Sequence, residues 1–344
     1  MKKIIIFSII FFALITQNCT KENKTEKIGS FPKKISLEGN VVESSLRASD
    51  LWIRDSIFIS ENVWSKENVF YTFNSSDNKL INTFGKRGKG PKEIRVPGAS
   101  YYDKPNNTMY ILDNGNNTIY KYDLKEKKIE PKKFIQIPSK LSQRVMEFEV
   151  LDTFNIVLQA YNKKNDLLLL INKNGNITKT FLNNPYDKNN LSKWTTFELY
   201  WNKIAKHPTK NIFVVAFRYF DRLMAVNLNK DSLLFDKVGP DFITHENIET
   251  YSHGAWKKNS KTKEGYFDIA VDNSFIYALY SGYLEESHKE ADRIFVFNWE
   301  GKPVAKLSLD HELWYIAIDK KRELYGVTPK ATKPLIRYKL PEFN

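Results

Sequence analysis

The residues with the clearest chemical potential lie in a short glycine-rich stretch, GKRGKGPK, at residues 85–92. Closely spaced glycines beside cations can cradle a phosphate, as they do in nucleotide-binding loops. In those loops a Lys-Ser or Lys-Thr pair follows the last glycine and a helix opens there, and this sequence has neither the pair nor a helical pattern. We therefore interpret the stretch as a flexible connection that carries two cations, Arg87 and Lys89.

Familiar catalytic motifs are missing from the rest of the sequence. It contains no HExxH zinc motif, no GxSxG nucleophile elbow and no DxDxDG calcium loop. The five histidines are scattered, so we predict no catalytic residue, no metal cluster and no cofactor. Calcium stays open as an alternative, because carboxylates that line a channel can hold it without a local motif. The candidates, each of which also fits a turn or a strand end, are Asp113, Asp221, Asp268 and Asp272.

A second set of side chains suits binding rather than catalysis. Cations and aromatic rings recur in the segments that separate apolar runs. Guanidinium groups make charge-assisted hydrogen bonds to anions, and aromatic planes stack on sugars and cations. The alternative is that these rings only pin the loops to the fold. The predicted ligand-binding residues are Arg87, Lys89, Arg218, Tyr219, Tyr251, His253 and Trp256.

These residues must be positioned by a repeated pattern of short strands. Apolar segments rich in Tyr, Phe and Ile alternate with turns of Asn, Asp and Gly, which is typical of strands joined by hairpins. The equivalent positions of the repeat are Phe58, Tyr110, Val157, Phe213, Tyr277 and Tyr325. Their successive spacings are 52, 47, 56, 64 and 48 residues. Units of this length hold four strands each, so the sequence predicts an all-β, six-bladed β-propeller.

The last unit lacks a strand, and the first strand lacks a unit. The final repeat ends at Asn344 with only three strands, whereas residues 34–42 form an isolated strand candidate. We predict that this N-terminal strand closes the last blade, which removes free sheet edges. In the up-and-down order of such blades, the long segments 183–203, 240–265 and 281–292 decorate one face of the disc. Because long loops are often functional, this is the predicted binding face.

Residues 85–124 carry a family signature. The pattern G-x-x-G-x-G-P from Gly85 to Pro91, followed by Pro97-Gly98, MYILD and TIYKYD, resembles an NHL repeat. The whole chain resembles the NHL-like or TolB-like six-bladed propeller lipoproteins of Bacteroidetes. This resemblance implies the fold but no particular activity, because many members have none established and a fold does not define a function.

The N-terminus predicts export and anchoring. Lys2 and Lys3 precede an apolar run at residues 4–15, which fits a signal peptide and is shorter than the roughly 20 residues of a membrane-spanning helix. Cys19, the sole cysteine, follows this run and resembles the acylated cysteine of a bacterial lipoprotein. We therefore predict a signal peptide over 1–18, a lipidated tether over 19–33 and the propeller over 34–344. The predicted location is the cell envelope, with the lipid in the outer membrane.

The charge of the chain does not point to a nucleic-acid partner. The formal net charge of +13 becomes +11 without Lys2 and Lys3, the lysines are spread rather than clustered, and no recognition helix is visible. We predict a non-catalytic binding or scaffold module for a protein, peptide or glycan, with membrane contact through the lipid on Cys19. The alternative function is a metal-dependent hydrolase or a polysaccharide lyase that uses the central channel.

Overall fold

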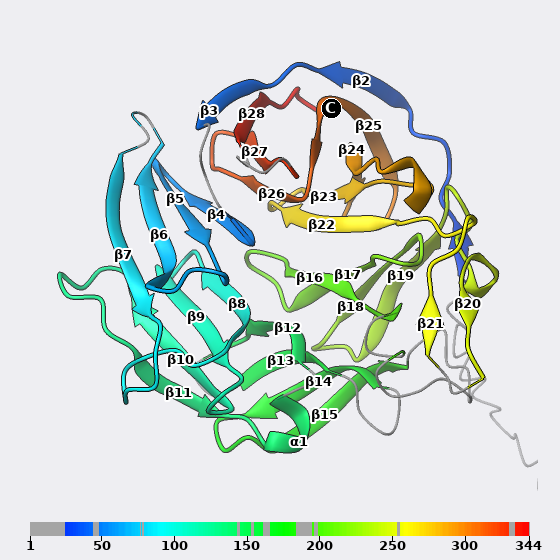
Figure 1. The fold of residues 1–344 in the computed structure, drawn as a ribbon. Helices are drawn as coiled ribbons and strands as arrows, with labels where there is room; N and C mark the ends of the chain where they lie inside the picture. Colours follow the sequence, from blue (N-terminus) through cyan, green and yellow to red (C-terminus); the bar gives the residue numbers. More distant parts are fainter. Residues whose placement is uncertain are drawn as a thin grey trace, which may run out of the picture.

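Short, mostly antiparallel strands are arranged in a ring around a central axis in this computed structural model (Figure 1). The structure describes residues 25–343 except 44–47, 76, 78, 143–144, 153–154, 161–165, 184–194, 196–198, 253–254 and 330–333. Six sheets follow one another around the ring, four of them with four strands and two with an additional N-terminal strand. The predicted six-bladed β-propeller with four-stranded blades is therefore confirmed.

The first three blades run through the chain in sequence order. Blade 1 contains β4 (Asp50–Arg54), β5 (Ile57–Glu61), β6 (Asn68–Asn74) and β7 (Leu80–Lys86). Blade 2 contains β8 (Pro97–Asp103), β9 (Thr108–Asp113), β10 (Thr118–Asp123) and β11 (Lys132–Gln136). Blade 3 contains β12 (Val145–Val150), β13 (Asn155–Ala160), β14 (Asp166–Asn172) and β15 (Ile177–Asn183). The short helix α1 (Ser139–Ser142) lies between blades 2 and 3.

The other three blades follow the same order. Blade 4 contains β16 (Asn202–Lys206), β17 (Ile212–Phe217), β18 (Arg222–Asn227) and β19 (Ser232–Val238). Blade 5 contains β22 (Tyr266–Val271), β23 (Phe275–Tyr280), β24 (Ala291–Asn298) and β25 (Pro303–Leu313). Blade 6 contains β26 (Tyr315–Ile318), β27 (Glu323–Val327), β28 (Leu335–Lys339) and β3 (Asn40–Glu43). In every blade the first strand lies innermost.

Apolar clusters between neighbouring blades form the core. Six such clusters occur among the described residues, one at each interface around the ring. The second strand of each blade packs against both neighbours, and β9 is accordingly buried along its whole length. This double burial explains why the second strands appear in the sequence as continuous apolar runs rather than as alternating patterns.

The N-terminal strap, defined here as residues 25–43, wraps the outer edges of three blades (Figure 1). Its strand β1 (Glu26–Lys27) pairs in parallel with β19, and β2 (Lys33–Leu37) pairs in parallel with β25. Strand β3 then pairs antiparallel with β28 and supplies the missing fourth strand of blade 6. Closure of the last blade by the N-terminus is therefore confirmed.

The details of the strap correct two sequence expectations. The single strand expected at 34–42 is two strands that break at Gly39, where an added Cβ would lie 2.3 Å from the Ile336 side chain. The fold also begins before residue 34: the Phe31 ring stacks on Phe295 at 4.8 Å between centroids, and Ile28 packs on the same cluster. A tether that reaches residue 33 is thus too long, because aromatic and β-sheet contacts already hold residues 26–31.

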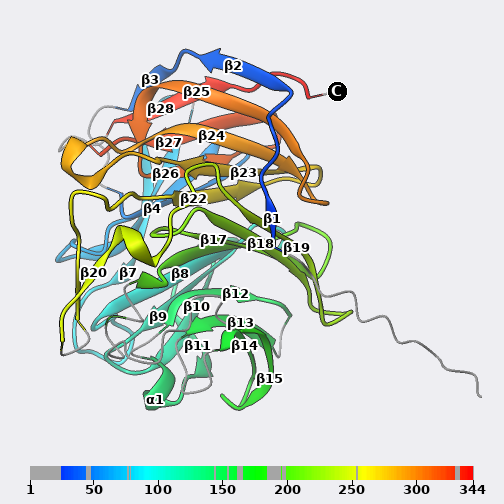
Figure 2. The same cartoon turned by 90° about the vertical axis from the view of Figure 1, so that its right-hand side faces the viewer.

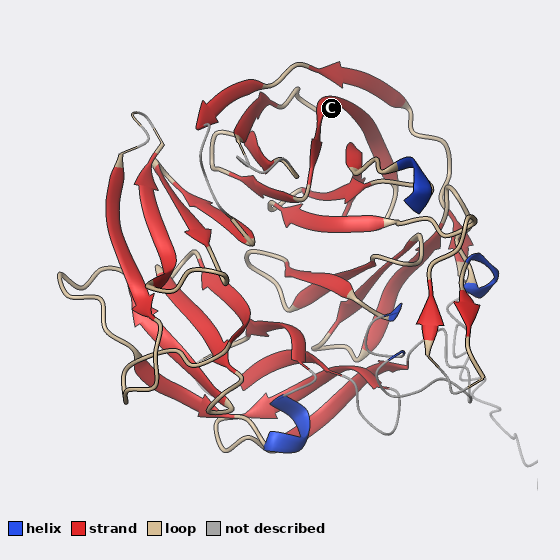
Figure 3. Ribbon diagram, viewed as in Figure 1, coloured by secondary structure: helices blue, strands red, loops and turns tan. Residues whose placement is uncertain are grey.

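The two faces of the disc carry different loops. The long-loop face is defined by the connections between blades and between second and third strands, and the short-loop face by the remaining turns. Two elements lie on the long-loop face, which is at the left in Figure 2. One is the hairpin of β20 (Glu249–Thr250) and β21 (Trp256–Lys257). The other is the 3-10 helix Glu285–Ser287, which is blue in Figure 3. No helix in the described part of the chain is long and apolar enough to span a membrane.

Candidate binding sites at the two ends of the channel

A cavity of about 1100 Å³ occupies the central channel. Its walls are the six inner strands, which contact their neighbours around the ring. Its mouth is formed by turns between first and second strands, with Lys104, His207 and Arg322 among the lining residues. The cavity therefore opens on the short-loop face. None of the predicted ligand-binding residues that the structure describes lines it, so it lies apart from their part of the predicted binding face.

An ion-pair cluster forms the inner end of the cavity. Lys203 of β16 places its Nζ 2.9 Å from Asp50 Oδ2 and 3.0 Å from Glu147 Oε1. The same ammonium lies 5.6 Å from the centroid of the Tyr315 ring. Burial opposes the charge of Lys203, but Asp50, Glu147 and Asp268 outweigh that effect and raise its pKa well above the ordinary value. Lys203 is thus a fixed cation at the point where inner-strand carboxylates converge.

Burial changes the protonation of the carboxyl groups around the channel. It raises the pKa of Glu147 to about 7 against the opposing effect of Lys203, and it raises the pKa of Glu149 to about 8 against Lys206. Burial and the nearby Asp50 raise the pKa of Glu61 to about 8, although the hydroxyls of Ser100 and Ser49 donate hydrogen bonds to it. Glu149 and Glu61 therefore keep most of their protons at neutral pH, whereas Glu147 titrates there and pairs with Lys203 in its ionised form.

The channel carboxylates also satisfy backbone groups of the inner strands. An innermost strand is a sheet edge, so the backbone N–H groups that face the channel have no partner within the blade. Asp268 of β22 accepts such a hydrogen bond from the Ile316 backbone of the next blade, at 2.7 Å. Burial raises the pKa of Asp268 despite Lys203. These acids therefore join neighbouring blades as well as lining the cavity.

The aspartates at the cavity mouth are turn residues. Asp272 Oδ1 accepts hydrogen bonds from the Ser274 and Phe275 backbones, both at 2.7 Å, and Asp319 Oδ1 accepts one from the Lys321 backbone at 2.8 Å. His207 has the same position in blade 4, where its Nδ1 accepts from the Thr209 backbone at 3.1 Å.

The other two calcium candidates, Asp113 and Asp221, also accept backbone hydrogen bonds. Both cap loops rather than line the channel. In the described part of the chain, no three His, Cys, Asp or Glu side chains are grouped so as to hold a metal ion.

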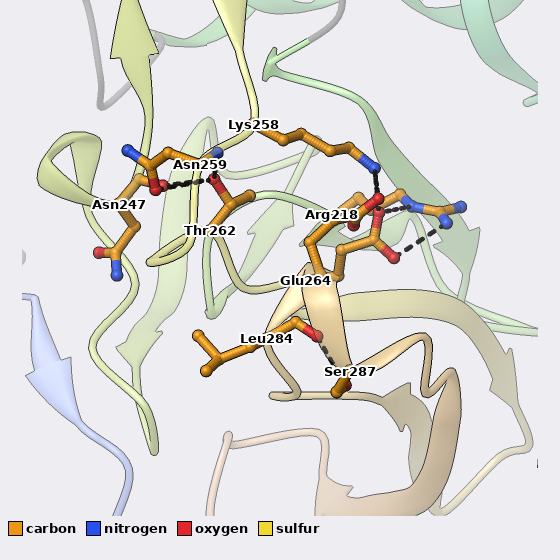
Figure 4. Close-up of polar contacts among 9 residues, drawn as sticks. Arg218, Asn247, Lys258, Asn259, Thr262, Glu264, Leu284 and Ser287 are labelled. Atoms are coloured by element: carbon orange, nitrogen blue, oxygen red, sulfur yellow. Dashed lines mark hydrogen bonds and ion pairs between the residues drawn. The ribbon is translucent and has the colours of Figure 1, made fainter.

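The predicted Arg218 and Tyr219 lie on the long-loop face between blades 4 and 5, where Arg218 is tightly held (Figure 4). Its Nε and Nη2 donate hydrogen bonds to the two carboxylate oxygens of Glu264 at 3.3 and 3.1 Å, and its guanidinium lies 4.1 Å from the Phe267 ring centroid and 5.3 Å from that of Trp201. Lys258 donates to the same carboxylate at 3.3 Å. Two of its N–H groups bond Glu264 and two aromatic rings flank it, so Arg218 braces this loop.

Trp256 joins this group, and the other predicted residues lie farther out. The Trp256 ring packs edge-on against Tyr219 at 4.9 Å, while Tyr251 at the tip of the β20–β21 hairpin is 47% exposed. The long loop that carries them is braced from within: the Thr262 hydroxyl donates to the Asn247 carbonyl at 2.7 Å (Figure 4). His253 and Cys19 lie outside the described residues.

Arg87 and Lys89 lie on the same face but between blades 1 and 2. They belong to a different connection from the Arg218 group, and the single rim that the sequence predicts stays a prediction. The glycine-rich connection is also compact rather than flexible. A salt bridge at 2.8 Å links Lys86 and Glu93 across it, and an added Cβ at Gly88 would lie 1.9 Å from Glu93.

Exposed apolar side chains gather on the long-loop face. Trp64 of the β5–β6 loop is 63% exposed, and Trp201 before β16 is 42% exposed. Val96, Phe242 and Tyr251 belong to connections between blades and are also exposed. Most other large exposed apolar residues lie on outer strands, such as Ile177 of β15. Trp64 is a further candidate that the sequence prediction missed, because nothing in its loop distinguishes it from a buried Trp.

Comparisons with known proteins agree with this architecture. Residues 36–321 match the family model described as TolB-like 6-blade propeller-like. One similar solved structure is that of a Bacteroides fragilis NCTC 9343 protein described as a putative exported protein. It is 10% identical with a TM-score of 0.57, and the match covers 89% of this chain and 99% of that one. A member of the DUF4221 family from Bacteroides vulgatus ATCC 8482 is 10% identical with a TM-score of 0.58, covering 93% and 100%. No curated protein sequence matches the chain.

Proposed function

Because this chain belongs to the TolB-like family of six-bladed propellers, we propose that it is an exported binding module whose long-loop face holds a protein partner. The observation that carries the proposal is the set of exposed rings on that face, led by Trp64, Trp201 and Tyr251. Trp and Tyr are the residues that most often dominate binding energy in protein interfaces. Trp64 belongs to blade 1 and Trp201 to blade 4, so the rings span a broad face, which suits a protein better than a small ligand.

Substitution of the exposed rings tests this proposal. The triple variant Trp64→Ala, Trp201→Ala and Tyr251→Ala should capture its partner from an envelope extract at least tenfold less well than the unchanged protein, because each buried ring contributes about 2 kcal/mol. Quantitative mass spectrometry of the captured proteins gives the measurement. The matched control is Ile177→Ala, an exposed apolar residue on an outer strand. Equal loss in that control, or no loss in the triple variant, contradicts the proposal.

The location is a second part of the proposal. The charged and apolar pattern of residues 1–18 and the single Cys19 support export followed by acylation, and two or three acyl chains anchor a protein firmly because each buried methylene contributes about 0.8 kcal/mol. The Bacteroides fragilis protein of similar fold is described as a putative exported protein, which is consistent with this location. Protein partners of such a module belong to the cell envelope.

Removal of the cysteine tests the anchor. Cys19→Ala should move the protein from the detergent-extracted membrane fraction to the soluble fraction, because the acylated side chain is gone. Immunoblots of the two fractions measure the shift, and metabolic labelling with an alkyne-tagged fatty acid should lose its signal in the variant. A variant that stays in the membrane fraction would show that another part of the chain holds it there.

A further inference from the structure

One side wall of the channel cavity holds a carboxyl oxygen with no protein partner. Glu149 of β12 lines the cavity and is 8% exposed. The Tyr101 hydroxyl and the Lys206 backbone also hydrogen-bond to this carboxyl group and lower its pKa, but its buried Oε2 has no partner in the described part of the chain. A buried oxygen without a hydrogen-bond partner destabilises the folded protein. A hydroxyl group inside the cavity would supply the missing partner, and a protonated Glu149 could also donate to it.

Aromatic rings continue the same wall between blades 2 and 3. The Tyr101 and Tyr110 rings stack at 6.1 Å between centroids, and Phe134 packs edge-on against Tyr110 at 5.0 Å. Tyr101 also lies 6.4 Å from Phe148. All four line the cavity. A wall of tilted aromatic rings thus lies beside a hydrogen-bonding carboxyl group, and sugars present the matching combination of C–H groups and hydroxyl groups.

The charges of the lining argue against a strongly ionic ligand. The described lining residues include nine acidic and eight basic side chains, so the cavity has little net charge. The acids at the mouth are occupied by turn hydrogen bonds, as Asp272 and Asp319 show. Lys203 at the inner end is paired with Asp50 and Glu147. A ligand that gains from hydrogen bonds and stacking rather than from charge fits this lining best.

We propose that the channel cavity binds a neutral oligosaccharide, which stacks on the wall of Tyr101 and Phe134 and bonds Glu149 through a hydroxyl group. The cavity volume of about 1100 Å³ lies at the upper end of ordinary ligand pockets, which gives room for several sugar rings. This site opens on the short-loop face, opposite to the protein-binding face, and does not depend on it.

Calorimetric titration with maltohexaose, cellohexaose and xylohexaose tests the site. At least one should bind with one-to-one stoichiometry and a Kd below about 1 mM. Glu149→Leu should weaken that binding at least tenfold, whereas Glu149→Gln, which keeps a hydrogen-bonding side chain of the same shape, should retain most of it. Phe134→Ala, a change nearer the surface, should also weaken it at least tenfold. The Trp64→Ala variant of the opposite face is the control and should bind unchanged.

Three outcomes overturn the proposal. One is that no neutral hexasaccharide binds the folded protein at millimolar concentration. Another is that tetragalacturonic acid binds more tightly than every neutral probe, which would assign the cavity to anionic ligands. The third is binding that survives Phe134→Ala and Glu149→Leu but is lost in Trp64→Ala. Circular dichroism melts establish whether each variant is folded. If Glu149→Leu is not folded, the binding of Phe134→Ala tests the proposal.

Discussion

A chain that begins at residue 32 will unfold at a markedly lower temperature than one that begins at residue 25. The missing residues contain Phe31, which stacks on Phe295, and Ile28, whose backbone N–H donates to the Val238 carbonyl at 2.9 Å. Phe31 is partly buried, so its loss should cost part of the about 3–5 kcal/mol that a fully buried Phe side chain contributes. A chain that begins at residue 44 should lose still more, because blade 6 then has an open edge at β28. Thermal melts followed by circular dichroism measure the difference.

Point variants keep this prediction testable if the shortest chain does not fold. Phe31→Ala should lower the stability of the chain that begins at residue 25 nearly as much as the truncation to 32 does. Val41→Ala is the matched control, because this strap residue is 59% exposed and should change stability little. Equal melting temperatures for the chains that begin at 25 and 32 would mean that the strap contributes nothing before β2.

Replacement of Lys203 by Met should cost about 3–5 kcal/mol at pH 7, the usual effect of breaking a buried ion pair. The change leaves Asp50 and Glu147 without their cation. Guanidinium chloride unfolding at pH 5, 7 and 8.5 measures the loss. A second variant that combines Lys203→Met with Asp50→Asn and Glu147→Gln should recover most of the stability, because it leaves no unpaired charge.

The loss of stability caused by Lys203→Met should increase as pH rises. The folded-state pKa of Glu147, already raised to about 7, will rise further without the cation, whereas an unfolded Glu titrates near 4.3. Both proteins therefore lose stability as pH rises from about 4.3 to about 7, and the variant goes on losing it above pH 7 because its folded Glu147 still holds a proton there. The variant should therefore be closest to the unchanged protein at pH 5. A loss of stability that is equal at pH 5 and pH 8.5 contradicts this account.

The blade pattern could be predicted from sequence, whereas the layer of charges inside the channel could not. The second strands are buried on both sides and so leave long apolar runs, such as MYIL and IFVVA, that mark every blade. The inner strands instead carry charged residues, such as Glu147 and Glu149 in VMEFEV. In sequence these look like the solvent face of an ordinary strand, because only the closed ring turns that face into a channel.

The predicted binding residues show the same limit of sequence reasoning. Strand order correctly assigned Arg218, Trp256 and Arg87 to one face, because up-and-down connectivity fixes which loops share a side. It gave no information on side-chain partners, so the bidentate bond from Arg218 to Glu264 could not be foreseen. The charge of Arg218 suggested a ligand contact, which stays a prediction, and in the structure this charge pairs with Glu264.

The strap also sets the order in which the molecule can be completed. Val41 pairs with Ile336, and the Gly39 backbone N–H donates to Asp310. These contacts of the N-terminal strap can form only after blades 5 and 6 have been synthesised. Such long sequence separations slow folding, because the chain entropy of a large loop must be lost before the contact forms. A chain still under synthesis therefore cannot close its ring. For an exported protein this delay keeps the polypeptide open until its C-terminus has been released.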